Sequence, residues 1–302
     1  MKWRKLGRVY CPTGELPWAR RYASFPTVEL QDSGAVRVHV TCLDDQDFGR
    51  GGYVDLDPRD LTRIISCAQT PALDLGQIGD FDDAGANPST VLEFGGRTLV
   101  YYQGWQRTLR APYAIFTGVA ARSADGSFTR WRRTPVLERT DDEPHLRAAP
   151  FVMQHGGMLR MWYVGSGTWS NIGGRLYYHV NIRHAVSEDG VHWSVDPKVC
   201  IAPNDAEYAV GRPVVLLDGS TYRMWYSIRS FDRPYAIGYA ESEDGLHWIR
   251  LDHAVGIARS ESGWDSEMIC YGYVVKINGQ LAMFYNGNRH GSTGFGCALQ
   301  AD

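Results

Sequence analysis

Acidic side chains recur at one place in this sequence, a few residues ahead of the positions where short apolar strands are expected to begin. The recurring acids are Asp82 or Asp83, Glu143, Glu207, and Asp265 or Glu267. Carboxylates that converge repel one another, so some keep a proton near neutral pH unless cations separate them. Such crowding produces general acid and base pairs. Asp83, Glu207, Asp265 and Glu267 are therefore the catalytic candidates, although a loop acid more often serves as a solvated charge or a turn cap.

Polar and aromatic residues near the same positions are candidates for substrate binding. Arg147 and Arg212 flank expected strand openings, and guanidinium groups there favour an anionic substrate group, either carboxylate or phosphate. Trp105 and Trp264 offer rings that can stack on a sugar face. The remaining binding candidates are Asn87, Glu143, His145 and Tyr271. The histidines lack zinc-ligand spacing, so we expect His145 to form hydrogen bonds, and we expect neither a metal nor a cofactor.

Two repeated phrases define the elements that must position these side chains. A Ser-x-Asp-Gly turn followed by tryptophan occurs at residues 123–126, 187–190 and 242–245. An upstream strand pattern ends at Tyr102, Tyr163, Tyr226 and Tyr285. Strands open at Pro26, Pro88, Pro150, Pro213 and Gly272, about 60 residues apart. Alternating apolar and polar residues between turns indicate strands, and the Asp-Gly pairs are typical of hairpins. We expect the Met-Trp-Tyr strands to be core and the Ser-x-Asp-Gly turns to be structural.

Four strands in each of five units predict an all-β, five-bladed β-propeller. The fifth unit ends at residue 302 after a third strand, so a fourth strand must come from elsewhere. Residues 2–6 match the outer strands that contain Trp131 and Trp248. We expect this N-terminal strand to pair with the last blade, which removes a sheet edge and closes the ring. Residues 1–302 would then form one domain, with the links from outer to inner strands crossing the face of a central funnel.

The composition is that of an ordinary globular protein and excludes several classes of partner. Hydrophobic residues make up 44% of the chain and charged residues 22%, and the formal net charge is −3. Neither a nucleic acid nor a membrane is an expected partner, and no apolar run has the length of a signal peptide or membrane helix. We expect a cytoplasmic protein. Its six widely spaced cysteines are expected to be reduced core thiols.

The repeat resembles that of the five-bladed propeller glycosidases, namely glycoside hydrolase families 43, 32, 68 and 130. More closely, residues 81–89, 207–213, 262–268 and 285–296 resemble an uncharacterised bacterial group described as glycosidase-like. The resemblance implies a propeller with catalytic acids in its funnel. The chain departs from the family pattern at three places. Residues 22–26 contain no aspartate, where families 43 and 32 have one. Arg147 matches the arginine of an Arg-Asp-Pro motif of family 32, but the acid of that motif is absent. Before Pro213, where the family has its general acid, the nearest acid is Glu207.

Taken together, these observations predict an enzyme that cleaves a glycosidic bond in a sugar carrying an anionic group. Such cleavage needs one carboxylic acid to protonate the leaving oxygen and a second carboxylate to serve water or attack the sugar. We assign Glu207 as the acid and Asp83 as the base or nucleophile, with Asp265 or Glu267 as alternatives. The expected partner is a small carbohydrate or sugar phosphate. A glycoside phosphorylase and a non-catalytic sugar-binding propeller remain the alternatives, because a fold does not determine a function.

Overall fold

The structure of the protein, a computed structural model, describes residues 1–301 except for the side chain of Ser166. Apart from the short turns η1 (Asp252–Ala254) and α1 (Asn288–Gly291), its elements are strands. The strands are β1 (Trp3–Tyr10), β2 (Arg21–Leu30), β3 (Val36–Leu43), β4 (Gly49–Asp57), β5 (Asp60–Cys67), β6 (Gly85–Phe94), β7 (Arg97–Arg107), β8 (Tyr113–Arg122), β9 (Phe128–Arg130), β10 (Leu146–His155), β11 (Met158–Ile172), β12 (Arg175–Ser187), β13 (Ser194–Ile201), β14 (Glu207–Asp218), β15 (Thr221–Ser230), β16 (Ala236–Ser242), β17 (Ile249–Arg250), β18 (Cys270–Ile277), β19 (Gln280–Asn286) and β20 (Phe295–Gln300). Within this described part, no helix is long and apolar enough to cross a membrane.

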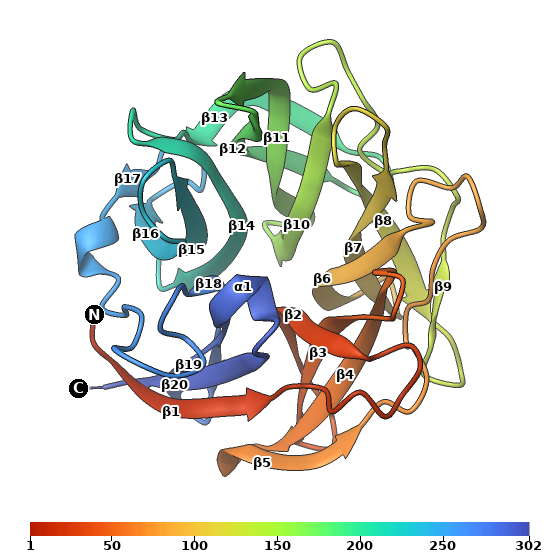
Figure 1. Cartoon of the computed structure of the whole chain (residues 1–302), viewed down its shortest axis with the longest axis vertical. Coiled ribbons are helices and arrows are strands. Elements are labelled where there is room, and N and C mark those ends of the chain that lie inside the picture. Colours follow the sequence, from red (N-terminus) through yellow and green to blue (C-terminus); the bar gives the residue numbers. More distant parts are fainter. Residues whose placement is uncertain (302) are drawn as a thin grey trace.

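Antiparallel pairing joins the strands in groups that follow the chain. The groups are β2–β5, β6–β9, β10–β13 and β14–β17, followed by β18, β19, β20 and β1. Short parallel contacts link β4 to β6, β8 to β10, and β12 to β14. Figure 1 shows the groups arranged around a common centre, with the first strand of each group nearest to it. This arrangement brings the beginnings of strands far apart in sequence to one central region.

The N-terminal strand pairs with the last strand of the chain, as predicted from its sequence. β1 runs antiparallel to β20, with Trp3 opposite Gln300 and Lys5 opposite Ala298. The indole of Trp3 is buried and donates a hydrogen bond to the carbonyl of Val255 at 2.8 Å. In Figure 1 the two ends of the chain lie beside each other. Strand β1 therefore covers an edge of β20 that would otherwise present unpaired backbone groups.

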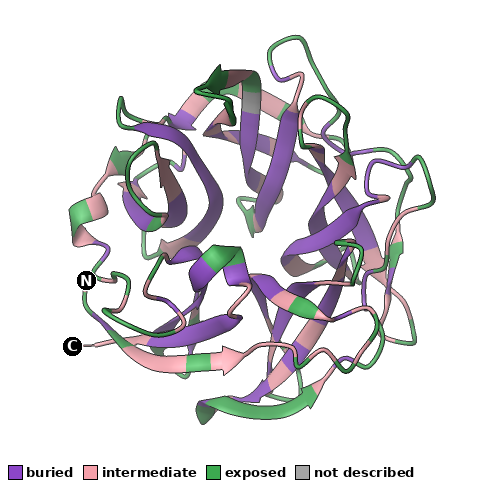
Figure 2. Cartoon of the chain, in the orientation of Figure 1, coloured by how far each residue is buried: buried purple, intermediate pink, exposed green. Residues whose placement is uncertain are grey.

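The second strand of each group carries the core, which confirms the prediction made from the repeated Met-Trp-Tyr phrase. Trp162 and Trp225 are fully buried, and so are the repeat tyrosines Tyr163 and Tyr226 that follow them. Figure 2 shows that burial is concentrated in the strands around the centre, while the peripheral strands and turns are more exposed. Apolar packing of these inner strands is the main source of stability for such a fold.

Two Ser-x-Asp-Gly turns have the same internal hydrogen bonds, which gives them the structural role predicted for them. Asp189 accepts bonds from the backbone N–H groups of Val191 and His192, both at 2.8 Å. Asp244 does the same for Leu246 and His247. In a turn these backbone N–H groups have no neighbouring strand to bond with, so the aspartate oxygens satisfy them instead. The aspartates therefore hold outer hairpins and do not serve the centre.

Candidate functional site

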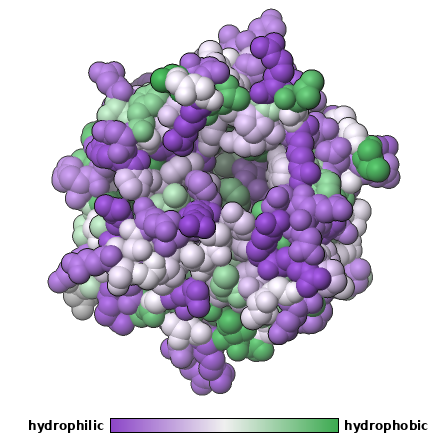
Figure 3. Space-filling model, viewed as in Figure 1, coloured by the Kyte–Doolittle hydropathy of each residue, from purple (hydrophilic) through white to green (hydrophobic). Residues whose placement is uncertain are grey.

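A cavity of about 670 Å³ lies at the centre of the molecule, where the groups of strands meet. Figure 3 shows the corresponding face hollowed near its middle. Its lining combines aromatic rings with cationic side chains. The rings belong to Tyr22, Phe25, Trp105, Tyr113, Tyr178, Tyr208, Phe231, Tyr235 and Tyr271, and the basic side chains are Arg175, Arg212, Arg229, Arg233 and His290. A volume of this size is that of a small-molecule site.

One position of the repeat sends a side chain into the cavity from each group of strands. These residues precede the strand-opening proline or glycine and are Phe25, Asn87, Ala149, Arg212 and Tyr271. Four of them have a left-handed backbone, with φ between 49° and 58°. The ladder register shifts beside every one of them. A bulge of this kind re-aims the side chain, and left-handed non-glycine residues cost about 1–3 kcal/mol, a strain that is concentrated at functional sites.

Arg212 lines the cavity and connects three groups of strands. Its guanidinium donates to the carbonyl of Ser89 at 3.0 Å, to the carbonyl of Pro26 at 3.3 Å and to the hydroxyl of Thr27 at 2.6 Å. The side chain is buried, and burial lowers its pKa to about 10. Arg212 therefore remains charged at neutral pH, and its positive charge is not cancelled by any carboxylate within the part of the chain that is described.

Arg229 lies in the wall of the cavity between two tyrosines. Its guanidinium carbon is 4.6 Å from the ring centroid of Tyr178 and 4.8 Å from that of Tyr235. Such cation–π contacts orient a guanidinium without neutralising it. Over residues 1–301, no ion pair to Arg229 is present, and its buried Nε has no hydrogen-bond partner. The cavity thus presents an oriented cation whose charge is available to a ligand.

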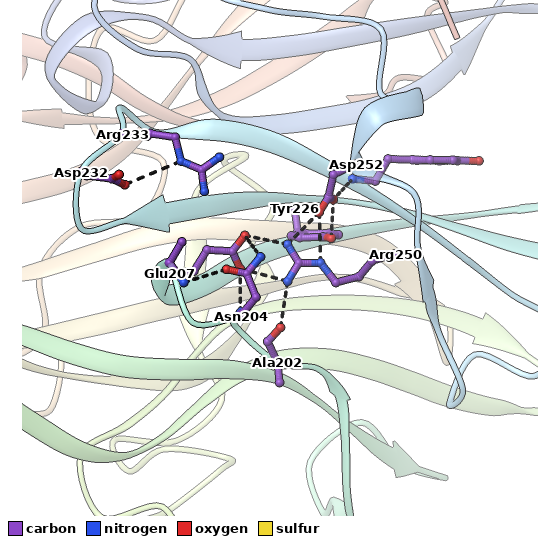
Figure 4. Close-up of polar contacts among 10 residues, drawn as sticks. Ala202, Asn204, Glu207, Tyr226, Asp232, Arg233, Arg250 and Asp252 are labelled. Carbon is purple, nitrogen blue, oxygen red and sulfur yellow. Dashed lines mark hydrogen bonds and ion pairs between the residues drawn. The ribbon is translucent and has the colours of Figure 1, made fainter.

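No aspartate or glutamate belongs to the cavity lining among the described residues. The carboxylates of the repeat instead face the interior of their own groups of strands. Figure 4 shows Glu207 held by Arg250, with both Nη–Oε distances at 2.9 Å. Asn204 donates to the same carboxylate through its backbone N–H at 3.1 Å and its side-chain amide at 2.9 Å. Glu207 is buried in this network, away from the lining.

In three other groups a carboxylate is held by a cation and also by the repeat tyrosine. Asp82 accepts from Tyr102 at 2.9 Å and from Arg130 at 2.6 Å, and burial raises its pKa in spite of that arginine. Asp265 accepts from Lys5 at 2.6 Å and from Tyr285 at 3.0 Å. Asp82 and Asp265 each tie a link to the core tyrosine of their own group, whereas in the group of Glu207 the repeat tyrosine Tyr226 donates to Asp252 at 2.6 Å.

Glu143 is the third such carboxylate. It accepts from Tyr163 at 2.9 Å and from the Nε of Arg147 at 2.7 Å, and Arg183 lies 3.2 Å away. Arg147 is therefore paired inside its group and does not line the cavity, which corrects the expectation that it would face the centre with a free charge. The reason is electrostatic, because Glu143 is buried beside Arg147 and an unpaired buried carboxylate is costly.

Some of the site residues predicted from the sequence line the cavity, and others do not. Asn87, Trp105, Arg212 and Tyr271 line the cavity together, whereas Asp83, Glu143, His145, Arg147, Glu207, Trp264, Asp265 and Glu267 are outside its lining. Asp83 accepts a backbone hydrogen bond from Gly79 at 2.9 Å. Trp264 packs on Tyr285, with ring centroids 5.1 Å apart. Glu267 differs from the other acids, because its side chain is 56% exposed, it lies 3.8 Å from Arg289, and it directly precedes the lining residue Met268.

Two curated proteins of Mycobacterium tuberculosis are related to this chain along nearly its whole length. The uncharacterized protein MT1551 of strain CDC 1551 / Oshkosh and the uncharacterized protein Rv1502 of strain ATCC 25618 / H37Rv are each 37% identical to it over 300 residues. The alignments cover 99% of this chain and 99% of each relative. The chain belongs to the family of these two proteins. No family model matches it.

Solved structures show which fold this family member has. A protein described as a glycoside hydrolase superposes with a TM-score of 0.76 at 17% identity, covering 99% of this chain and 91% of the other. A thermostable family-43 glycoside hydrolase gives a TM-score of 0.68 at 16% identity, with 94% and 90% covered. An α-L-arabinofuranosidase from Lactobacillus brevis gives 0.68 at 11% identity, with 92% and 90% covered. The chain therefore shares its fold with these proteins described as glycoside hydrolases, which agrees with the resemblance noted in its sequence.

Several lining residues of this family member were missed in the sequence, and Arg229 is the most important of them. A usable signal existed, because Arg229 lies three residues after the repeat tyrosine Tyr226, and Trp105 lies three residues after Tyr102. Both side chains line the cavity from the second strand of their group. Tyr178, Tyr235 and His290 carry no such signal, because they belong to the extended β11–β12 hairpin, an irregular link and the turn α1.

Proposed function

We propose that this chain binds a carbohydrate bearing an anionic group in its central cavity. The observation that carries the proposal is the lining itself, which holds nine aromatic side chains and four arginines but no carboxylate among the described residues. Aromatic rings offer apolar faces that stack on sugars, and arginines bind carboxylate or phosphate through paired hydrogen bonds. The likeness in fold to proteins described as glycoside hydrolases supports a carbohydrate as the ligand.

The scaffold we propose for this site is a single five-bladed β-propeller domain spanning residues 1–302, closed by the pairing of β1 with β20. Support comes from five antiparallel groups of four strands within the described chain. Support also comes from Arg212, whose hydrogen bonds join residues of three groups across the centre. A ring of this kind explains why one equivalent residue of each group reaches the same cavity.

The binding proposal predicts a selective effect of removing the charge of Arg229. Replacing it in the variant Arg229→Met should weaken binding of an acidic oligosaccharide about ten- to a hundredfold, because a hydrogen bond to a charged group contributes about 1.5–3 kcal/mol. Isothermal titration calorimetry with carboxylated, phosphorylated and neutral oligosaccharides of equal length measures the effect. Arg132→Met is the matched control, because Arg132 is exposed and lies outside the lining.

The same titrations decide whether charge matters at all. Binding of the acidic ligand should weaken as salt is added, though less than at an exposed site. A preference for phosphorylated sugars would support the phosphorylase alternative, in which arginines hold phosphate. Binding of neutral sugars alone, with no loss in Arg229→Met, would overturn the proposal of an anionic ligand.

Cleavage of a glycosidic bond by carboxylates is the second candidate, and Glu267 is the acid whose exposure favours it. Asp83, Glu207 and Asp265 are engaged in hydrogen bonds outside the lining, whereas Glu267 is exposed next to a lining residue. If Glu267 is a general acid, Glu267→Gln should lower kcat about 10²–10⁴-fold while binding persists. Unchanged turnover in this variant would remove the last of the four predicted catalytic acids.

A further inference from the structure

We propose that the cavity cleaves uronate-containing oligosaccharides by β-elimination, with Arg229 holding the uronate carboxylate, His290 removing the C5 proton and Tyr235 protonating the leaving oxygen. The inference rests on the proposed binding of an anionic carbohydrate. The described lining of the cavity contains no carboxylic acid that could serve hydrolysis. It does contain a guanidinium, an imidazole and phenols that lie side by side.

These groups are neighbours in space although they come from separate elements. Arg229 is in β15, Tyr235 precedes β16, and His290 is in the turn α1. The Arg229 guanidinium is 4.8 Å from the Tyr235 ring centroid, and the rings of Tyr235 and His290 are 4.8 Å apart and nearly perpendicular, at 81°. Tyr271 lies 6.3 Å from both rings and stacks on Phe25 at 4.2 Å. A single sugar residue can therefore touch all of them.

The chemistry of a uronate fits this spacing. Its C5 carbon is bonded to the carboxylate carbon, so a base that removes the C5 proton must lie beside the cation that holds the carboxylate. The leaving oxygen on C4 is only two bonds from C5, so the proton donor must lie near as well. Pairing with Arg229 also neutralises the carboxylate and makes the C5 proton more acidic, in the manner of other electrostatic stabilisers of developing charge.

The protonation states of the two rings suit opposite tasks. Desolvation of the His290 ring against its aromatic neighbours, together with the charge of Arg229, lowers the pKa of His290, so the imidazole is neutral near pH 7 and can accept a proton. Desolvation raises the pKa of Tyr235, so this phenol keeps its proton and can donate it. Near neutral pH the imidazole of His290 is therefore the proton acceptor of the two rings and the phenol of Tyr235 is the proton donor.

The backbone around His290 holds its ring at the cavity. Arg289 and His290 both have left-handed φ values, 51° and 62°. The hydroxyl of Ser24 donates to the His290 carbonyl at 2.6 Å, and Asn286 donates to the carbonyls of Ala23 and Gly294 at 2.7 and 3.0 Å. These bonds attach the turn to β2 across the chain. Strain of this kind persists where the surroundings enforce it, commonly at functional sites.

The proposed step balances without an added oxidant, metal or water. His290 takes the C5 proton, and the electrons of the C5–H bond form a C4–C5 double bond. The C4–O bond breaks, its electron pair leaves on oxygen, and Tyr235 protonates that oxygen. The tyrosinate then regains its proton from the imidazolium of His290, whose ring is adjacent. The products are a new sugar end and an unsaturated uronate conjugated with its carboxylate.

The test incubates the full chain with oligogalacturonate and with a glucuronate-containing oligosaccharide, and it records ultraviolet absorbance of the unsaturated uronate alongside new reducing ends. We expect both signals in equal amounts. Reducing ends without absorbance would show hydrolysis and overturn the inference. Binding with neither signal would also overturn it while leaving the proposed function intact. No binding of any acidic saccharide would overturn both.

Variants assign the roles. His290→Gln and Tyr235→Phe should each lower the elimination rate about 10²–10⁴-fold while binding measured by calorimetry stays within about twofold. Arg229→Met should mainly weaken binding of the uronate oligosaccharide, and its lower elimination rate should follow from that weaker binding. The controls are His253→Gln and Tyr53→Phe, which remove the same groups from positions outside the lining. Full activity in both His290→Gln and Tyr235→Phe would overturn the assignment of base and acid, even if elimination is observed.

Discussion

Deletion of residues 1–8 is expected to lower the melting temperature by about 10 °C or more. The deletion removes most of β1, whose hydrogen bonds cover the edge of β20. It also removes the buried ring of Trp3, and loss of a buried aromatic ring alone costs about 3–5 kcal/mol. The ion pair between Lys5 and Asp265 is lost as well, which leaves a buried carboxylate whose one remaining side-chain partner among the described residues is Tyr285.

Thermal unfolding followed by circular dichroism measures this effect, and single variants separate its causes. Trp3→Ala should reproduce a large part of the loss without exposing the strand edge. Arg4→Ala is the matched control in the same strand, because Arg4 is exposed, and surface substitutions usually change stability by less than about 0.5 kcal/mol. A deletion variant that melts with the parent protein would contradict the role of β1. The uncovered β20 edge should also make the deletion variant aggregate more readily.

Glu207→Gln is expected to destabilise the protein by about 3–5 kcal/mol, because it leaves Arg250 in a largely buried site without its carboxylate. Both Nη atoms of Arg250 bond to Glu207, and Asn204 relies on the same oxygens. Asp252 remains as a second partner of Arg250 at 2.7 Å, which sets the loss toward the lower end of that range. Urea unfolding measures the change in the free energy of unfolding.

Two comparisons make this experiment decisive about the role of Glu207. Glu267→Gln removes the same charge from an exposed side chain and should change stability by less than about 0.5 kcal/mol. The double variant Glu207→Met, Arg250→Met removes both partners and should be more stable than Glu207→Gln, since an unpaired buried charge costs more than a missing pair. If Glu207→Gln were as stable as the parent protein but lost turnover, Glu207 would be a catalytic acid, as its sequence position predicted. The assignment of Glu207 as a structural partner of Arg250 would then be wrong.

The positions of the strands followed from the sequence to a useful degree. The repeat tyrosines, the glycine turns and the proline openings are local signals, and the strands and hairpins depend on local alternation and turn chemistry. The similarity of residues 2–6 to two outer strands predicted the partner of β1, because equivalent strands of a repeat carry equivalent side chains. The burial of Trp162 and Trp225 followed for the same reason.

The candidate site was predicted only in part, and the failures have one cause. The sequence showed acids recurring before strand openings, but not whether those side chains turn toward the centre or into their own group. Glu207 and Asp265 turn inward to cations on β17 and β1, which are distant in sequence. A buried carboxylate lies where a cation can pair with it, and that pairing exists only once the strands are assembled.

By itself, the sequence determined that the chain is built from repeated antiparallel strands, that β1 joins the last group, and that Asn87, Trp105, Arg212 and Tyr271 lie near strand openings that reach the centre. The tertiary structure decided the chemical character of the cavity. Bulges with left-handed residues turn Phe25, Ala149, Arg212 and Tyr271 inward. Arg229 has no carboxylate partner among the described residues, and the buried acids Asp82, Glu143, Glu207 and Asp265 are each paired with a cation of their own group. Whether a charged side chain points to the centre or into its own group depends on contacts between strands that are distant in sequence. For that reason the acids could be recognised in the sequence, whereas the cationic, aromatic cavity could be recognised only in the folded structure.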